Sequence, residues 1–181
     1  MITLPEDAEV DPETAAATLS AAADRALANV IAMRAAEGRA LERDLRAALA
    51  EARAAVAAIA AAAPGRLDEH HAHLRERVER MVARLGTVPV EESRLAQELI
   101  LMADRLDVSE EIARIGSHFD QMEALLRAGA AIGRKADFLI QEMGREANTI
   151  GSKSQDAELT RQVVLLKSAI ERLREQVQNV E

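Results

Sequence analysis

Residues 41–63, LERDLRAALAEARAAVAAIAAAA, decide the fold, because their apolar residues recur with the period of an α-helix. These apolar positions lie three or four residues apart, at Leu41, Leu45, Leu49, Ala52, Val56 and Ile59. Ala, Leu, Glu and Arg, all strong helix formers, supply most of the remaining positions. We therefore predict a long helix with an Ala-rich side that lets a partner helix approach closely.

The whole composition points the same way. The 181 residues contain no Cys, Trp or Tyr and only two Phe, and no run of β-branched and aromatic residues is present from which a sheet would be built. The predicted fold class is all-α, with a long Ala-rich helical hairpin followed by a C-terminal helical bundle. We place the helical hairpin or arm in residues 1–89 and a C-terminal helical domain in residues 90–181.

The ends of the arm can be read from turn and cap residues. Asp11 is placed to cap a helix whose first residue is Pro12. Pro64 cannot continue a helical hydrogen-bond ladder, so the first helix is expected to end at residues 63–65. A second helix over residues 67–85 should then fold back antiparallel to the first.

Further helices are expected in the second half of the chain. A third helical stretch covers residues 90–126, and Asp107 begins a pattern that resembles a capping box, which indicates re-capping there. The fourth helix is predicted to run from residue 134 to 148, with Ser152 capping the last helix after a turn.

Charge and missing motifs exclude several classes of function. The formal net charge is −8, so contact with nucleic acid requires a local basic patch. Without Cys, neither a disulfide framework nor a Cys-based zinc site is available. We expect no membrane span, because no 18 consecutive residues are apolar, and we expect a cytoplasmic protein, because the first residues lack the pattern of a secretory signal. The P-loop, dinucleotide-binding, zincin and nucleophile-elbow motifs are all missing from the sequence.

The first candidate for chemistry is RLAQELILMADRLDVSEEIARIGSH, residues 94–118. On a continuous helix one stripe would carry Asp107, Glu111, Arg114 and His118. Two carboxylates and an imidazole are suitable ligands for Mg²⁺ or Mn²⁺, or a general base beside such an ion. An exposed stripe of ion pairs is the alternative interpretation.

The second candidate is GRKADFLIQEMGREANTIGSKS, residues 133–154. One stripe of its helix would carry Asp137, Gln141, Arg145 and Asn148, and the neighbouring stripe Glu142, Glu146 and Thr149. Phe138 is expected to face inward. Carboxylates beside the cations Arg134, Lys135, Arg145 and Lys153 suit phosphodiester cleavage, since acids hold a metal and cations neutralise the phosphate. Ion pairing on a helix surface would explain the same residues.

These two segments, extended to GRKADFLIQEMGREANTIGSKSQDAE, together with IERLREQVQNVE (residues 170–181) and MRAAEGRALERDL (residues 33–45), resemble the YicC/YloC family of bacterial endoribonucleases. The resemblance covers residues 30–181 and, more weakly, 12–29. It implies a cytoplasmic, stress-linked endoribonuclease that needs a divalent metal, assembles as a hexamer and closes around RNA. Family members also carry a mostly β N-terminal region that this sequence lacks, and we expect assembly and cleavage to involve that region.

The sequence is therefore consistent with two functions. As an endoribonuclease, a hydrolase acting on RNA phosphodiesters, the chain would use catalytic residues His118, Glu111, Glu142 and Glu146. RNA would be bound by Arg114, Arg134, Lys135, Arg145, Asn148 and Lys153. Divalent Mg²⁺ or Mn²⁺ would be held by Asp107, Glu111, Asp137 and Glu142. The expected partners are RNA and further copies of the chain, with neither a membrane nor DNA. The alternative is a non-catalytic helical module for oligomerisation or as an adaptor, which the Ala-rich helices also fit.

Overall fold

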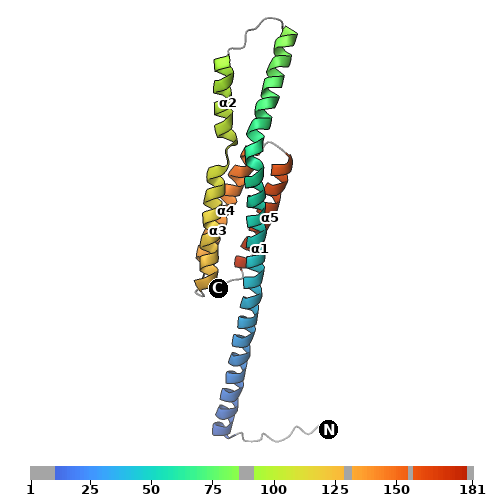
Figure 1. Ribbon diagram of the computed structural model, residues 1–181. Helices are drawn as coiled ribbons and strands as arrows, with labels where there is room; N and C mark the ends of the chain where they lie inside the picture. Colours follow the sequence, from blue (N-terminus) through green and yellow to red (C-terminus); the bar gives the residue numbers. More distant parts are fainter. Residues whose placement is uncertain (1–10, 86–91, 129–131, 155–156, 179–181) are drawn as a thin grey trace, which may run out of the picture. The chain divides into compact units, whose positions relative to one another are not determined.

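The computed structural model describes residues 11–85, 92–128, 132–154 and 157–178. These residues form α1 (Pro12–Leu85), α2 (Glu92–Leu106), α3 (Ser109–Ala128), α4 (Gly133–Lys153) and α5 (Ala157–Val177), with no strand in the described ranges (Figure 1). The all-α prediction is confirmed. The chain divides into two compact units, Met1–Leu41 and Glu42–Glu181. The domain boundary predicted near residue 89 falls outside the described residues.

The first unit contributes the beginning of α1. Asp11 caps this helix as predicted, because its Oδ2 accepts hydrogen bonds from the backbone N–H (3.1 Å) and the hydroxyl (2.7 Å) of Thr14. These two bonds lower the pKa of Asp11. Five large apolar side chains among the described residues of this unit are exposed to solvent, namely Leu19, Leu27, Val30, Ile31 and Met33.

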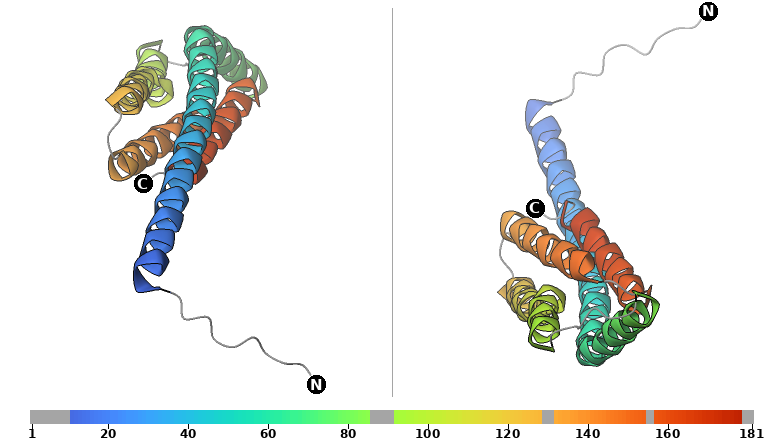
Figure 2. Two further views of the ribbon diagram at one scale, coloured as in Figure 1. Left: turned by 90° about the horizontal axis from the view of Figure 1, so that it is seen from below. Right: turned by 90° about the horizontal axis from the view of Figure 1, so that it is seen from above.

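The second unit contains a bundle of four helices: α3, α4, α5 and the part of α1 that follows residue 42. In Figures 1 and 2, α4 lies beside both α3 and α5. Arg53 of α1 reaches Asp120 of α3, with 2.6 Å between Nη2 and Oδ1. On its other side α1 is joined to α5 by an ion pair between Glu51 and Arg172.

One hydrophobic core fills the bundle. From α1 it takes Leu45, Leu49, Ala52, Val56 and Ile59, and α3 contributes Ile115, Phe119 and Met122. The contributions of α4 and α5 follow the same helical spacing and include Ile140, Met143, Ile150, Val163, Leu166 and Leu173. The apolar series of the opening segment therefore lies in the core from residue 45 onward, while Leu41 precedes it in the first unit.

The hairpin predicted at residues 63–65 is wrong, because α1 continues through Pro64. Proline removes one backbone donor and strains the preceding turn. That turn is held by tertiary packing, since Ala62 and Ala63 are partly buried against the bundle core. Packing therefore overrides the local preference for a break.

The re-capping predicted near Asp107 is confirmed, whereas the end of the fourth helix differs from the prediction. Asp107 lies between α2 and α3, where its Oδ1 accepts a hydrogen bond of 2.9 Å from the backbone N–H of Ser109. The helix is thus not continuous from Asp107 to His118. α4 runs to Lys153 rather than to residue 148, because Ala147 and Ile150 are buried. The hydroxyl of Ser152 accordingly donates to the carbonyl of Thr149 instead of capping α5.

Part of α1 is apolar enough to be compared with a membrane helix. Between Pro12 and Gly65 an 18-residue window has a mean hydropathy that reaches 1.4, and a third of that window is buried in the structure. Apolar residues of this stretch that are buried, such as Leu49, Val56 and Ile59, pack in the bundle core. Core packing therefore accounts for the buried third of this window, and the rest of the window is not buried.

Candidate active site

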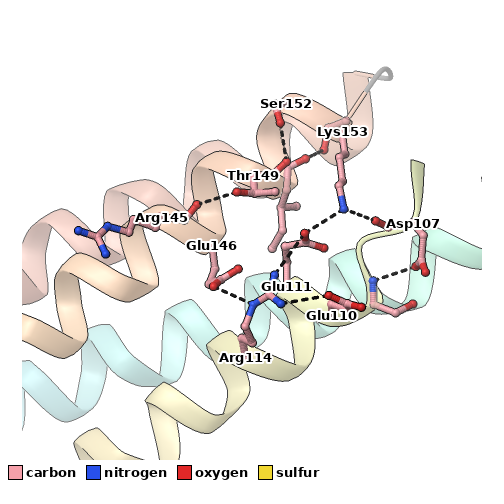
Figure 3. A network of polar contacts seen from close by, with 12 residues as sticks. Asp107, Glu110, Glu111, Arg114, Arg145, Glu146, Thr149, Ser152 and Lys153 are labelled. Carbon is pink, nitrogen blue, oxygen red and sulfur yellow. Dashed lines mark hydrogen bonds and ion pairs between the residues drawn. The ribbon is translucent and has the colours of Figure 1, made fainter. Parts of the chain in front are cut away.

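The two segments singled out from the sequence become neighbouring helices. α3 carries the end of the first segment and α4 most of the second, and the helices run antiparallel, since early α3 residues pair with late α4 residues. Each helix buries an apolar side in the core. The polar stripes beside those apolar sides therefore meet along the α3–α4 contact (Figure 3).

Lys153, at the end of α4, hydrogen-bonds to the beginning of α3 and to Asp107 just before it. Its Nζ donates to the backbone carbonyl of Asp107 at 2.7 Å and to Oε1 of Glu111 at 2.9 Å. Among the described residues Glu111 is the one polar side chain classed as buried, with 4% of its surface exposed. A carboxylate so removed from water requires a cation beside it. Lys153, from the other segment, supplies that cation.

Arg114 continues the network one turn along α3. Its Nε donates to Oε1 of Glu146 at 2.9 Å, its Nη1 to Oε2 of Glu110 at 3.1 Å, and its Nη2 to Oε1 of Glu111 at 3.5 Å. Glu146 is largely buried, with 13% of its side chain exposed, whereas Glu110 is 82% exposed. The guanidinium therefore bridges two helices and keeps one weakly held, solvent-facing partner.

The charges of this network affect protonation. Burial raises the pKa of Glu111, but hydrogen bonding to Lys153 and to backbone, together with the charges of Lys153 and Arg114, outweighs burial and leaves that pKa below its ordinary value. Hydrogen bonding to Ser109 lowers the pKa of Asp107. Both carboxyl groups are therefore ionised at neutral pH.

His118 and Glu142 follow in the same register. By helical spacing they lie one turn beyond Arg114 and Glu146 respectively, in the antiparallel direction, and no hydrogen bond or ion pair between His118 and Glu142 is found among the described residues. Oε1 of Glu142 accepts a 2.5 Å hydrogen bond from Arg145. Two buried side-chain atoms here have no hydrogen-bond partner among the described residues, Nδ1 of His118 and Oε2 of Glu111.

The remaining predicted residues lie elsewhere on α4. Asp137 is half-buried and accepts a 2.7 Å hydrogen bond from Gln141. Arg134, Lys135 and Asn148 are exposed. The described residues contain no group of three or more His, Cys, Asp or Glu side chains gathered as metal ligands. The structure thus joins Asp107, Glu111, Arg114, Glu146 and Lys153, and no described contact links Asp137 to them.

Two features were missed by sequence reasoning. Glu110 belongs to the network, and its place four residues before Arg114 is an ion-pair spacing that could have indicated this. Phe138 does not face inward as predicted but is 59% exposed. Its position midway along the stripe of Arg134, Gln141 and Arg145 was the available signal, because those neighbours are polar.

Comparison with known proteins identifies the family to which these two helices belong. A family model described as "Endoribonuclease YicC-like, C-terminal" matches residues 59–181. The chain belongs to this YicC-like family. The match includes α2 to α5 and the end of α1.

Two relatives support this assignment, one of them over nearly the whole chain. The YicC-like chain is 48% identical over 109 residues to a protein of Clostridioides difficile (strain 630) named "Probable endoribonuclease YicC", covering 59% of this chain and 37% of that relative. A protein of the same name from Haemophilus influenzae is 38% identical over 176 residues, covering 97% of this chain and 60% of the relative. In these two matches the chain spans 60% or less of the curated relative.

Proposed function

We propose that this chain carries the helical part of an endoribonuclease and that the α3–α4 polar contact binds the scissile phosphodiester of RNA. The proposal is carried by two ion pairs, Arg114–Glu146 and Lys153–Glu111. They join the two segments, on α3 and α4, that resemble the family. The names of the two relatives support RNA cleavage as the reaction class. Cytoplasmic RNA is the proposed substrate.

Arg114 is the proposed phosphate-binding group of the site. It is 48% exposed, and its partner Glu110 is held at 3.1 Å on the solvent side. A phosphate oxygen can replace Glu110 at Nη1 while Glu146 continues to orient the guanidinium from within. Lys153 and Arg145 add positive charge along the same contact, which a chain of net charge −8 needs locally.

His118 is the proposed proton carrier. A buried Nδ1 without a partner leaves the imidazole free to take up or release a proton at that atom when substrate arrives. Glu142, at the same level of the contact, is the proposed group that orients the reacting hydroxyl or water. Arg134, Lys135 and Asn148 would bind phosphates farther along the strand, since all three are exposed on α4.

A requirement for Mg²⁺ or Mn²⁺ is part of the proposal, but the described residues do not fit a metal centre by themselves. The carboxylates predicted as ligands each accept a hydrogen bond, Asp107 from Ser109, Glu111 from Lys153, Asp137 from Gln141 and Glu142 from Arg145. No step is therefore assigned to the ion. Comparing activity in Mg²⁺, Mn²⁺ and EDTA tests the requirement.

The proposed assembly is a homo-oligomer, with the hexamer implied by the family resemblance. The exposed apolar side chains of residues 12–41 favour association, among them Leu19 (70% exposed), Ile31 (67%) and Met33 (63%). The same observation favours the second candidate function, a non-catalytic module that oligomerises or acts as an adaptor. Analytical ultracentrifugation over a range of protein concentrations measures this association directly.

The deciding experiment is a gel assay of a labelled structured RNA with the purified chain. We expect His118→Gln to abolish cleavage while far-UV circular dichroism stays unchanged. The matched control is His73→Gln, which makes the same change at an exposed residue of α1. Glu142→Gln is compared in the same way with Glu171→Gln, a glutamate of α5 whose side chain is 59% exposed.

Three results of this assay are distinguishable. Loss of cleavage in His118→Gln and Glu142→Gln alone supports the site. Undiminished cleavage in these two variants contradicts the site but not the activity. If the unmodified chain fails to cleave RNA with either metal ion, the endoribonuclease proposal for this chain fails and the adaptor module is favoured.

A further inference from the structure

Phe138 is exposed to solvent, and the chain contains very few aromatic residues. The sequence contains two Phe and no Trp or Tyr. Phe119 lies in the core with 1% of its surface exposed, whereas Phe138 is 59% exposed. An aromatic side chain left in water gives up the burial that normally stabilises it. Because single exposed apolar side chains are common at protein surfaces, the inference depends on which residues surround Phe138.

The neighbours of Phe138 on α4 are polar on the exposed side. Arg134 lies four residues before it, Lys135 three before, and Gln141 three after, all on the surface of the helix. Neither Arg134 nor Lys135 makes an ion pair or hydrogen bond to any residue that the structure describes. The Cβ atoms of these two unpaired cationic residues thus lie one helical turn, about 5–6 Å, from the Cβ atom of Phe138.

This combination favours nucleic acid over protein as the ligand. A single ring among polar side chains is not a continuous apolar patch of the kind that marks a protein interface, and Lys, present here as Lys135, is depleted at interface cores. Single-stranded RNA, by contrast, is bound by an aromatic ring that stacks on a base together with cations that hold the backbone. Charge complementarity therefore favours a single-stranded nucleic acid, and the proposed function makes that strand RNA.

We propose that Phe138 stacks on an unpaired base of RNA while Arg134 and Lys135 bind the adjoining phosphates. This inference rests on the proposed endoribonuclease function, because it extends the substrate from the α3–α4 contact onto the outer surface of α4. Recognition of an unpaired base would direct the enzyme to loops and single-stranded segments. Phe138 is accordingly a positioning residue that sets substrate preference.

The chain itself provides a clean test, because it contains no Trp. In Phe138→Trp the introduced indole is the single Trp fluorophore, and we expect its emission to be quenched when single-stranded oligoadenylate or oligouridylate is added. The matched control is Val164→Trp on α5, where the native side chain is also 59% exposed. The control should show no quenching.

A binding measurement complements the fluorescence. By fluorescence anisotropy of a labelled oligonucleotide, we expect Phe138→Leu to weaken binding of single-stranded RNA roughly tenfold without changing the salt dependence. Lys135→Gln should instead reduce the salt dependence, since it removes a phosphate contact. The aromatic variant Phe138→Trp should retain binding, which distinguishes stacking from a structural role of the residue.

Several outcomes would overturn the inference. These are equal quenching at positions 138 and 164, unchanged RNA affinity in Phe138→Leu, no RNA binding by the unmodified chain, or a shift of the indole emission with protein concentration in the absence of RNA. The last result would mean that another copy of the chain covers Phe138. RNA that is bound through Phe138 but never cleaved would support this inference and contradict the proposed enzymatic function.

Discussion

Residues 12–41 and residues 42–63 belong to one helix and have similar Ala-rich sequences, yet their apolar side chains have opposite environments. Leu27 is 61% exposed and Ile31 67%, whereas Leu49 is 2% exposed and Ile59 is fully buried. Helix propensity and an Asp11 cap are sufficient to explain the first segment. The second segment additionally packs against α3, α4 and α5 in one core. A helical pattern in sequence therefore predicts the helix but not whether a partner covers its apolar side.

The largest expected effect on stability comes from a substitution in the buried segment, residues 42–63. Leu49→Ala should lower the free energy of unfolding of the bundle by about 3 kcal/mol, because it leaves a cavity among buried side chains. Leu27→Ala, the same change in the exposed segment, should shift it by no more than about 0.5 kcal/mol. Urea denaturation followed by circular dichroism measures both values. Similar losses for the two variants would mean that Leu27 is covered in solution.

Polar contacts give the second test. Lys153→Met leaves the buried Glu111 carboxylate without its nearest cation and should destabilise the bundle by about 3 kcal/mol. Arg25→Met is the control in the first segment, where the guanidinium donates to the carbonyl of Ala21 at the surface. Its expected effect is within about 0.5 kcal/mol.

The ion pair between Glu111 and Lys153 also predicts that the stability of the bundle depends on pH. Because the pKa of Glu111 is lowered in the folded state, its ionised form contributes stability that is fully present above the ordinary value of 4.5 and is lost as the pH falls through the lowered value. Denaturation curves between pH 3 and 6 should show this loss in the unmodified chain. In Glu111→Gln this part of the pH dependence should disappear.

A smaller effect is expected from glycines inside helices. A Cβ atom added at Gly116 or at Gly38 would meet no heavy atom within 4 Å. Gly116→Ala should therefore stabilise the bundle by about 1 kcal/mol through helix propensity. Gly38→Ala, in the first segment, should raise helical content without changing the unfolding of the bundle. A stabilised bundle in Gly38→Ala would show that the two segments unfold together.

The smallest effect is local to the first segment. Asp11→Ala removes the cap and should increase amide exchange in the first turn of α1 roughly fivefold, with the bundle unaffected. The pKa of Asp11 is lowered, so the cap is intact above the ordinary value of 3.8 and weakens as the pH falls through the lowered value. The amide resonance of Thr14 should report this titration by NMR. A midpoint at or above 3.8 would contradict the capping geometry.

For the candidate site, the residues that share one side of a helix were predictable from the sequence, whereas the contacts between α3 and α4 were not. Steps of three and four residues placed Glu111, Arg114 and His118 on one stripe, and the structure confirms that all three lie on α3. Antiparallel packing of α3 against α4 then paired Arg114 with Glu146 across 32 residues of sequence. Spacing within one helix carries no information about such a partner. The four proposed metal ligands were grouped by residue type, and the contacts formed by their carboxylates depend on tertiary neighbours.

The all-α class, the Asp11 cap and the family are predictable from the residues alone, because they depend on residue type, periodicity and matching segments. Tertiary structure decided that α1 continues through Pro64, since packing of Ala62 and Ala63 on the core offsets the missing hydrogen bond. It also decided that Glu111 is buried beside Lys153 and that Phe138 faces solvent. Each of these outcomes depends on which helices lie next to one another, and that arrangement is fixed by the shared core rather than by any local segment.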